Sequence, residues 1–132
     1  YRNYKPPVLS QLNSLLAMSS IIYGITTCDT VRKARKWLQA EGIEARFHDL
    51  RKDGLDAETL EHWLHAQPMD VLLNRRGTSW RKLSEAEKAD SGIAHLKALI
   101  LANPTLLKRP IIEHKGHITV GFTAAEQDIL RG

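Results

Sequence analysis

The pattern of hydrophobic and polar positions predicts a strand, a helix and a second strand at the start of the folded region. The run Ile21–Ile25 is short and rich in β-branched residues, which is typical of a buried strand. From about Asp29, apolar residues recur at helical spacing until Gly42, which favours a helix end. Residues 44–50 then alternate as a second strand. Strand, helix and strand in this order predict a right-handed βαβ unit with parallel strands.

The middle of the sequence has the pattern of short helices. Asp56 can cap a helix over residues 57–66, and three of its residues form an expected buried face: Leu60, Trp63 and Leu64. The segment Ser84–Glu87 has a capping-box pattern that predicts another short helix. A further helix is expected over residues 92–102. Residues 56–106 are therefore predicted to form a helical insertion.

The end of the sequence returns to strands. Residues 111–114 and 117–120 are separated by Lys115 and Gly116, a two-residue connection that is typical of a β-hairpin. Thr123 is expected to cap a helix over residues 124–130. The full order is β-α-β, a helical insertion, and β-β-α.

Residues 1–17 have a different character from the rest. They contain a Pro6-Pro7 pair and lack the basic start and long apolar stretch of a signal peptide. We interpret them as an extension of upstream or vector origin, with Met18 as the natural start and residues 18–132 as the folded domain. The alternative is a native arm that docks on the domain through its apolar residues, which are Val8, Leu9, Leu12, Leu15 and Leu16.

Composition favours one soluble domain. The 132 residues are 42% hydrophobic and 26% charged, and the formal net charge is +4. Since residues 1–17 carry Arg2, Lys5 and no acid, only 17 basic residues face 15 acidic ones in the remainder, which favours a solvated surface over nucleic-acid binding. No apolar run approaches the roughly 18 residues that a membrane span needs. We expect a cytoplasmic monomer with no membrane partner.

The single cysteine, Cys28, excludes an intramolecular disulfide, a multi-cysteine zinc site and a dithiol couple. It lies between the first strand and the first helix, where backbone N–H groups and the helix dipole favour a thiolate. The Thr30 hydroxyl and Arg32 could add to this effect, whereas Asp29 would oppose it. The alternative is a buried cysteine that acts as a small hydrophobic residue. A strand-to-helix turn favours the reactive interpretation.

Other candidate groups carry weaker signals. His62 and His65 lie three residues apart on one predicted helix, and His114 and His117 flank the hairpin turn. Neither pair has an obvious third ligand, so we expect surface histidines and no metal site. The three tryptophans are expected in the core: Trp37, Trp63 and Trp80.

Three ordered motifs resemble the arsenate reductase (ArsC) and Spx family. They are YGITTCDTVRKA at residues 23–34, LNRRGT at 73–78, and KRPII at 108–112 followed by VGF at 120–122. The resemblance covers residues 18–132 and is greatest to the small YffB-type branch. It implies a thioredoxin-like α/β fold, with a four-stranded mixed sheet and a helical insertion. This is also the order of elements that the hydrophobic pattern predicts.

The resemblance also implies roles for individual residues. Cys28 matches the cysteine that attacks an oxyanion in the arsenate reductases, where glutathione and glutaredoxin then remove the product. Arg109 matches one of three arginines that hold the anion. The second arginine position falls on Asn74 and the third falls near Gly121, so two of the three anion ligands are missing or displaced.

Glutathione is the expected co-substrate, and no bound cofactor is expected. The resemblance implies a cis Arg109-Pro110 bond beside the cysteine, with neighbouring backbone groups free to pair with an extended thiol peptide. Because the chain has no second cysteine, an oxidised Cys28 needs an outside thiol to resolve it. Three polar residues could bind the glutathione carboxylates: Asn74, Arg75 and Arg76. The two arginines could equally form a solvated corner.

These observations favour a glutathione-dependent monothiol reductase that acts on a mixed disulfide or a small oxyanion. The alternative is an Spx-type regulator that binds the RNA polymerase α subunit without catalysis. Many Spx-type proteins have a Cys-x-x-Cys pair at this position, whereas here the fourth residue is Val31. A family member that folds and catalyses nothing is a third alternative.

Overall fold

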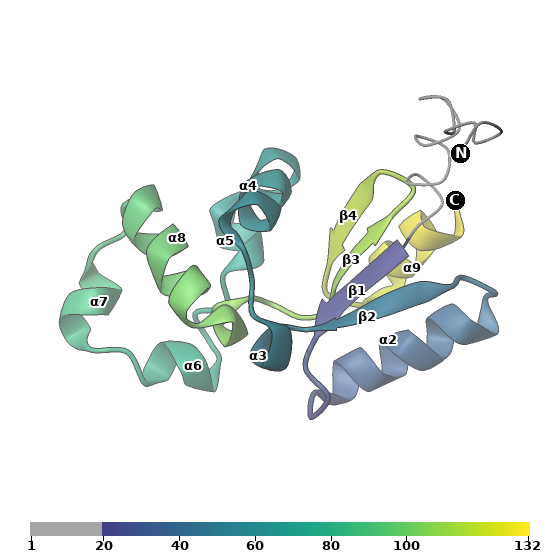
Figure 1. The fold of residues 1–132 in the computed structure, drawn as a ribbon, viewed down its shortest axis with the longest axis horizontal. Coiled ribbons are helices and arrows are strands. Elements are labelled where there is room, and N and C mark those ends of the chain that lie inside the picture. The colour runs from purple at the N-terminus through teal and green to yellow at the C-terminus, as the bar shows by residue number, and fades with distance from the viewer. Residues whose placement is uncertain (1–19) are drawn as a thin grey trace, which may run out of the picture.

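A four-stranded mixed sheet is the centre of the computed structural model, which describes residues 20–132 (Figure 1). The strands are β1 (Ser20–Gly24), β2 (Ala45–Asp49), β3 (Ile111–His114) and β4 (His117–Val120), in the order β2-β1-β3-β4. β1 is parallel to β2 and antiparallel to β3, and β4 is antiparallel to β3. This is a thioredoxin-like topology, so the predicted fold class is confirmed. The segment 1–17 lies outside the described residues.

Helices connect and cover the strands. α2 (Asp29–Ala40) joins β1 to β2, and α9 (Ala124–Arg131) follows β4. Between β2 and β3 lie α3 (Leu50–Asp53), α4 (Ala57–Ala66), α5 (Met69–Leu72), α6 (Thr78–Arg81), α7 (Glu85–Ala89), α8 (Ile93–Ala102) and the 3-10 helix η1 (Pro104–Leu106). The helices predicted at 57–66 and 92–102 are confirmed to within one residue. No helix within residues 20–132 is long and apolar enough to cross a membrane.

The predicted second strand was one residue too long at each end, because Leu50 begins α3. Asp49 is the N-cap of this helix, and its carboxylate accepts hydrogen bonds from the backbone N–H groups of Arg51 (2.9 Å) and Lys52 (3.1 Å). The cap satisfies N–H groups that the helix leaves free and stops the strand. Leu50 is consequently fully buried in the core.

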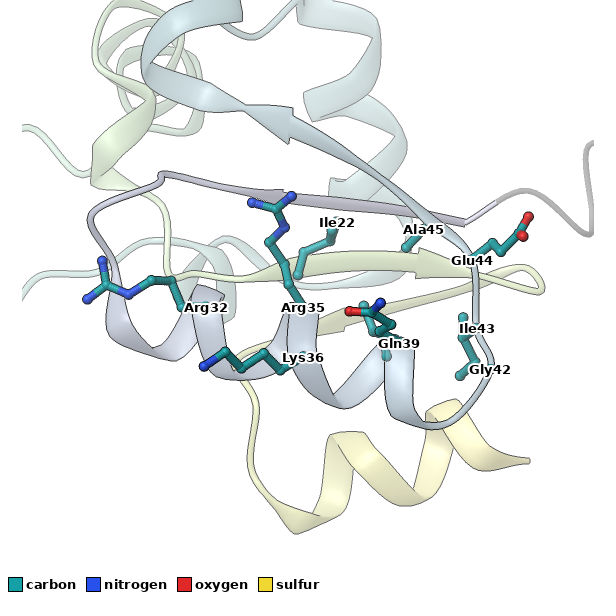
Figure 2. A pocket seen from close by; sticks show the side chains of 10 residues that line it. Ile22, Arg32, Arg35, Lys36, Gln39, Gly42, Ile43, Glu44 and Ala45 are labelled. Atoms are coloured by element: carbon teal, nitrogen blue, oxygen red, sulfur yellow. The ribbon is translucent and has the colours of Figure 1, made fainter.

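One face of the sheet packs against α2 and α9. Ile22 of β1 and Ile112 of β3 contact a cluster that includes Ala34 and Leu38 of α2 and Leu130 of α9. α2 also carries exposed cations beside this core, among which Arg32, Arg35 and Lys36 are shown in Figure 2. Trp37 is half-buried at the edge, where its ring meets Phe122 edge-on.

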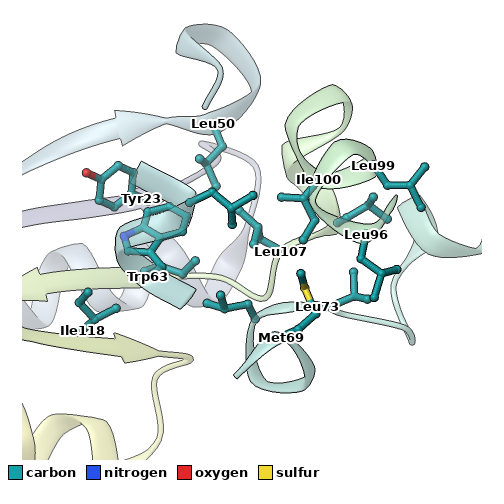
Figure 3. Packing of buried hydrophobic residues seen from close by; sticks show 14 of the residues in the cluster. Tyr23, Leu50, Trp63, Met69, Leu73, Leu96, Leu99, Ile100, Leu107 and Ile118 are labelled. Carbon is teal, nitrogen blue, oxygen red and sulfur yellow. The ribbon is translucent and has the colours of Figure 1, made fainter. Parts of the chain in front are cut away.

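The other face of the sheet joins the helical segment in the larger core. Trp63 of α4 is completely buried and its ring meets Tyr23 of β1 edge-on, at 4.7 Å between centroids (Figure 3). The indole Nε1–H donates to the Glu113 carboxylate at 2.8 Å. Burial, together with the nearby Glu113 carboxylate, raises the pKa of the Tyr23 hydroxyl above its ordinary value. Of the three tryptophans, only Trp63 is fully in the core, whereas Trp80 is half-buried like Trp37.

His114 is not the surface residue that the sequence led us to expect. It retains only 7% of its exposure and its Nδ1 lies 2.6 Å from the Ser20 hydroxyl, in a buried hydrogen bond. The hairpin itself forms as predicted, with Lys115 and Gly116 both at positive φ (48° and 78°). His114 is buried against Ser20, whereas His117, its partner across the hairpin, is exposed.

Gly24 allows α2 to approach β1 closely. A Cβ atom at Gly24 would lie 2.6 Å from Cγ2 and 2.8 Å from Cγ1 of the fully buried Val31. Gly24→Ala should therefore lower the free energy of unfolding in urea by about 1–3 kcal/mol, because overpacking strains the core. Gly24→Ala combined with Val31→Ala should cost less than the sum of the two single substitutions. Simple additivity would contradict the contact.

The pH dependence of stability should report the buried His114. Burial, followed by the charges of Lys115 and His117, lowers the pKa of His114. The unfolded chain therefore binds this proton more readily, so the contribution is fully present above the ordinary histidine pKa and is lost as pH falls below it.

His114→Asn, which keeps a polar partner for Ser20, should flatten the loss of stability between about pH 7.5 and about pH 5. Urea unfolding across that range measures the effect. His65→Gln, at an exposed position on α4, is the control and should leave the slope unchanged. An unchanged slope in His114→Asn would refute the assignment.

Candidate active site around Cys28

Cys28 is the N-cap residue of α2 and lies directly after the turn that ends β1. Its backbone N–H donates to the Ile25 carbonyl (3.3 Å), and its carbonyl accepts the N–H of Arg32 (3.1 Å). The side chain is half-buried against the larger core and makes no capping hydrogen bond. The sulfur thus lies at the positive end of a 12-residue helix and makes no capping hydrogen bond to it.

The charged neighbours of Cys28 are engaged with each other. Arg32 pairs with Asp29, and its Nη1 also donates to the Thr26 carbonyl at 3.1 Å. The Asp29 charge, which was expected to oppose a thiolate, therefore faces a guanidinium. Thr30 is exposed in the first turn of α2. Among the groups predicted to stabilise a Cys28 thiolate, the backbone N–H groups of α2 are the ones whose position is fixed by the fold.

The register of the sheet brings Pro110 to the same end as Cys28. Tyr23 of β1 pairs with Ile111 of β3, so Pro110 falls beside the end of β1, from which the chain turns to Cys28. The Arg109-Pro110 bond is cis, as the family resemblance implied. The Pro110 carbonyl accepts the Gly121 N–H at 2.9 Å. By contrast, no backbone hydrogen bond within residues 20–132 involves the N–H or the carbonyl of Arg109.

Arg109 is oriented by the loop before it. Its Nη1 donates to the carbonyl groups of Thr105 (2.7 Å) and Leu107 (3.4 Å). The Thr105 hydroxyl in turn lies 2.6 Å from the Ser79 hydroxyl of α6. Nε of Arg109 is buried and has no hydrogen-bond partner among the described residues. Sequence reasoning missed Thr105 and Ser79, because neither belongs to a recognisable motif and the contact spans two separate helices.

An isolated bridge between Leu73 and Leu107 places Asn74 beside the segment that leads to Arg109. Its N–H donates to the Leu106 carbonyl at 2.8 Å, and its side-chain oxygen accepts the Arg76 N–H at 3.0 Å. This asparagine therefore shapes the loop that follows it. Its backbone N–H and its side-chain oxygen are thus both engaged within the chain.

The two arginines after Asn74 differ in their surroundings. Arg75 donates to Asp70 at 2.9 Å and lies 5.6 Å over the Trp80 ring, so it is held against the helical segment. Arg76 is exposed, and no carboxylate pairs with it within the described chain. No group of three or more metal-ligating side chains occurs among residues 20–132.

Two relatives by sequence span most of the chain. A protein of Haemophilus influenzae without an assigned activity is 44% identical over 105 residues, covering 80% of this chain and 92% of its own length. The global transcriptional regulator Spx of Lactiplantibacillus plantarum is 27% identical over 108 residues, covering 80% of this chain and 81% of its own.

Two solved structures are similar as well. The YFFB protein has 40% identity and a TM-score of 0.80, with 86% of this chain and 99% of that one covered. An arsenate reductase (ArsC) related protein of Brucella melitensis has 47% identity and a TM-score of 0.67, with 84% and 92% covered. The ArsC family model matches residues 23–129. The motifs around Cys28, Asn74 and Arg109 all lie in this range, and the chain belongs to the ArsC family.

Proposed function

We propose that the protein is a glutathione-dependent monothiol reductase with Cys28 as its nucleophile. The observation that carries the proposal is the placement of a single half-buried cysteine at the N-terminus of α2, at the sheet end that also holds Pro110. Oriented backbone N–H groups at such a position stabilise a thiolate, which is the reactive form of a thiol. Arsenate reductase-related members of the family make thiol chemistry the favoured class.

The proposed reaction with a glutathione mixed disulfide has two exchange steps. The Cys28 thiolate attacks the glutathione sulfur, a disulfide forms between Cys28 and glutathione, and the substrate leaves as a thiolate that takes up a proton. A second glutathione thiolate then attacks that disulfide, which releases oxidised glutathione and restores the Cys28 thiolate. The net result is that the mixed disulfide and one added glutathione give the free substrate thiol and oxidised glutathione, and the exchange uses no second cysteine of the chain. Such a reaction needs the reducing conditions of the cytoplasm.

The residues near Cys28 have separate proposed roles. Thr30 and Arg32 contribute to thiolate stabilisation, and the unbonded backbone of Arg109 beside Pro110 pairs with the extended glutathione chain. The remaining guanidinium edge of Arg109, together with Asn74 and the exposed Arg76, binds a carboxylate or a small oxyanion. Arg75 can join them only by leaving Asp70. A mixed disulfide is favoured over arsenate, because the resemblance places the second arginine position of the arsenate reductases on Asn74 and the third near Gly121.

A second candidate function is regulatory. The similarity to the global transcriptional regulator Spx over most of both chains supports a protein that acts by binding RNA polymerase through its α subunit. Glutaredoxin is the expected partner only under the enzymatic hypothesis. Retention of the α subunit by the Cys28→Ser protein, with no thiol turnover in the wild type, would favour the regulatory hypothesis.

Cys28→Ser should abolish turnover while leaving the fold intact, because a serine hydroxyl cannot form the mixed disulfide. The measurement is glutathione-dependent reduction of a glutathionylated peptide, with oxidised glutathione detected through glutathione reductase. Mass spectrometry of the wild type should show one added glutathionyl group at Cys28. Thr27→Ser, at an exposed neighbouring position, is the control and should keep full activity. Residual enzymatic turnover in Cys28→Ser would refute the proposal.

Arg109→Lys should raise the KM for the glutathionylated substrate roughly tenfold or more, because one charge-assisted hydrogen bond is worth about 1.5–3 kcal/mol. Steady-state kinetics measure the change, and urea unfolding establishes that the variant is folded. Arg51→Lys, on the exposed surface of α3, is the matched control and should not alter KM. Equal KM values for Arg109→Lys and Arg51→Lys would show that the Arg109 guanidinium does not bind the substrate.

A further inference from the structure

A cationic groove runs along α2 beside β2, which is an edge strand of the sheet. It encloses roughly 750 Å³ between α2 and the start of β2, and its lining includes Arg32, Arg35, Lys36 and Gln39 of the helix (Figure 2). The floor is apolar and is formed by Ile22, Leu38, Ile43 and Ala45. A surface that combines an apolar floor with a row of cations is suited to an amphipathic, acidic occupant.

The cations of this groove are available for an outside partner. Arg32 is paired with Asp29, but no carboxylate within residues 20–132 pairs with Arg35 or Lys36. The Arg35 guanidinium lies 4.2 Å over the Phe47 ring of β2, so the aromatic ring holds this charge across the rim of the groove. Among the described residues that line the groove, the one acid is Glu44, which lies in the loop between α2 and β2.

The strand beside the groove is at an edge. Within the described chain β2 pairs with β1 alone, and its second residue, Arg46, is exposed. An edge strand presents backbone N–H and carbonyl groups on its outer side, and an extended segment can add to them as a further strand.

Residues 1–19 do not match this groove in charge, since they carry Arg2 and Lys5 and no acid. Arg35 and Lys36 are consecutive residues, so they form one cluster of positive charge that attracts an acidic side chain of a partner segment.

We propose that this groove docks an acidic, extended segment of a partner protein, which adds to the outer edge of β2. Its acidic side chains all lie on the face that meets α2, where their carboxylates reach Arg35 and Lys36 and their methylene groups cover the groove floor. The alternate apolar residues point to the opposite face of the sheet. The surface goes beyond the proposed thiol chemistry and does not depend on it.

The probe is a capped nine-residue peptide of alternating glutamate and valine, titrated into the full isotopically labelled chain. Amides of residues 45–49 should shift and gain protection from hydrogen exchange, and binding should weaken as salt increases. The double variant Arg35→Glu/Lys36→Glu should weaken binding at least tenfold. Arg51→Glu/Lys82→Glu changes the charge equally at exposed positions outside the groove and should bind as the wild type does. Cys28→Ser should also bind normally, which separates this test from that of the reductase.

Several outcomes would overturn the proposal. One is binding that survives the Arg35→Glu/Lys36→Glu change. Another is equal affinity for a peptide of the same composition with its glutamates in one block, which would indicate diffuse attraction. Binding without protection of residues 45–49 would exclude strand addition. Dimerisation of the chain that the same double variant abolishes, with no peptide binding, would assign the groove to a second copy.

Discussion

The position of β1 in the middle of the sheet is the constraint on which the rest of the structure depends. It is hydrogen-bonded to β2 on one side and to β3 on the other, so its register with both is fixed. Since a slip of one residue would exchange the two faces of a strand, Ile22 and Tyr23 must remain in their separate cores. The same register sets the turn after Gly24 beside Pro110. The location of the candidate site is therefore a consequence of strand pairing.

The larger core connects this sheet to the helical segment. Trp63 packs on Tyr23 and donates to Glu113, while Leu50 and Leu107 continue the apolar contacts toward Ile100 of α8 (Figure 3). The loops that carry Asn74 and Arg109 lie along this connection, because Leu73 and Leu107 form a bridge. Packing in this core therefore sets where both polar side chains lie relative to the sheet.

The regular elements could be predicted because their patterns are local. Residues 57–66 have a capping residue and helical spacing, and the hairpin at Lys115 has a short turn between two apolar runs, so both follow from sequence. The position of Cys28 between the first strand and the first helix followed in the same way. The burial of His114 and the support of Arg109 by Thr105 depend on contacts between distant segments. Local sequence patterns do not predict such contacts unless the residues belong to a known motif.

The pairing of Arg32 with Asp29 changes how the candidate site should be understood electrostatically. An arginine that is held by an adjacent carboxylate and by the Thr26 carbonyl contributes little net charge to the nearby sulfur. The backbone N–H groups of α2 are fixed by the helix and need no side-chain ordering to act on it. In the proposed reaction the helix terminus is therefore the main stabiliser of a thiolate, and Arg32 makes a smaller contribution. The cations further along α2 are consequently free to serve a different surface, since the thiol does not require them.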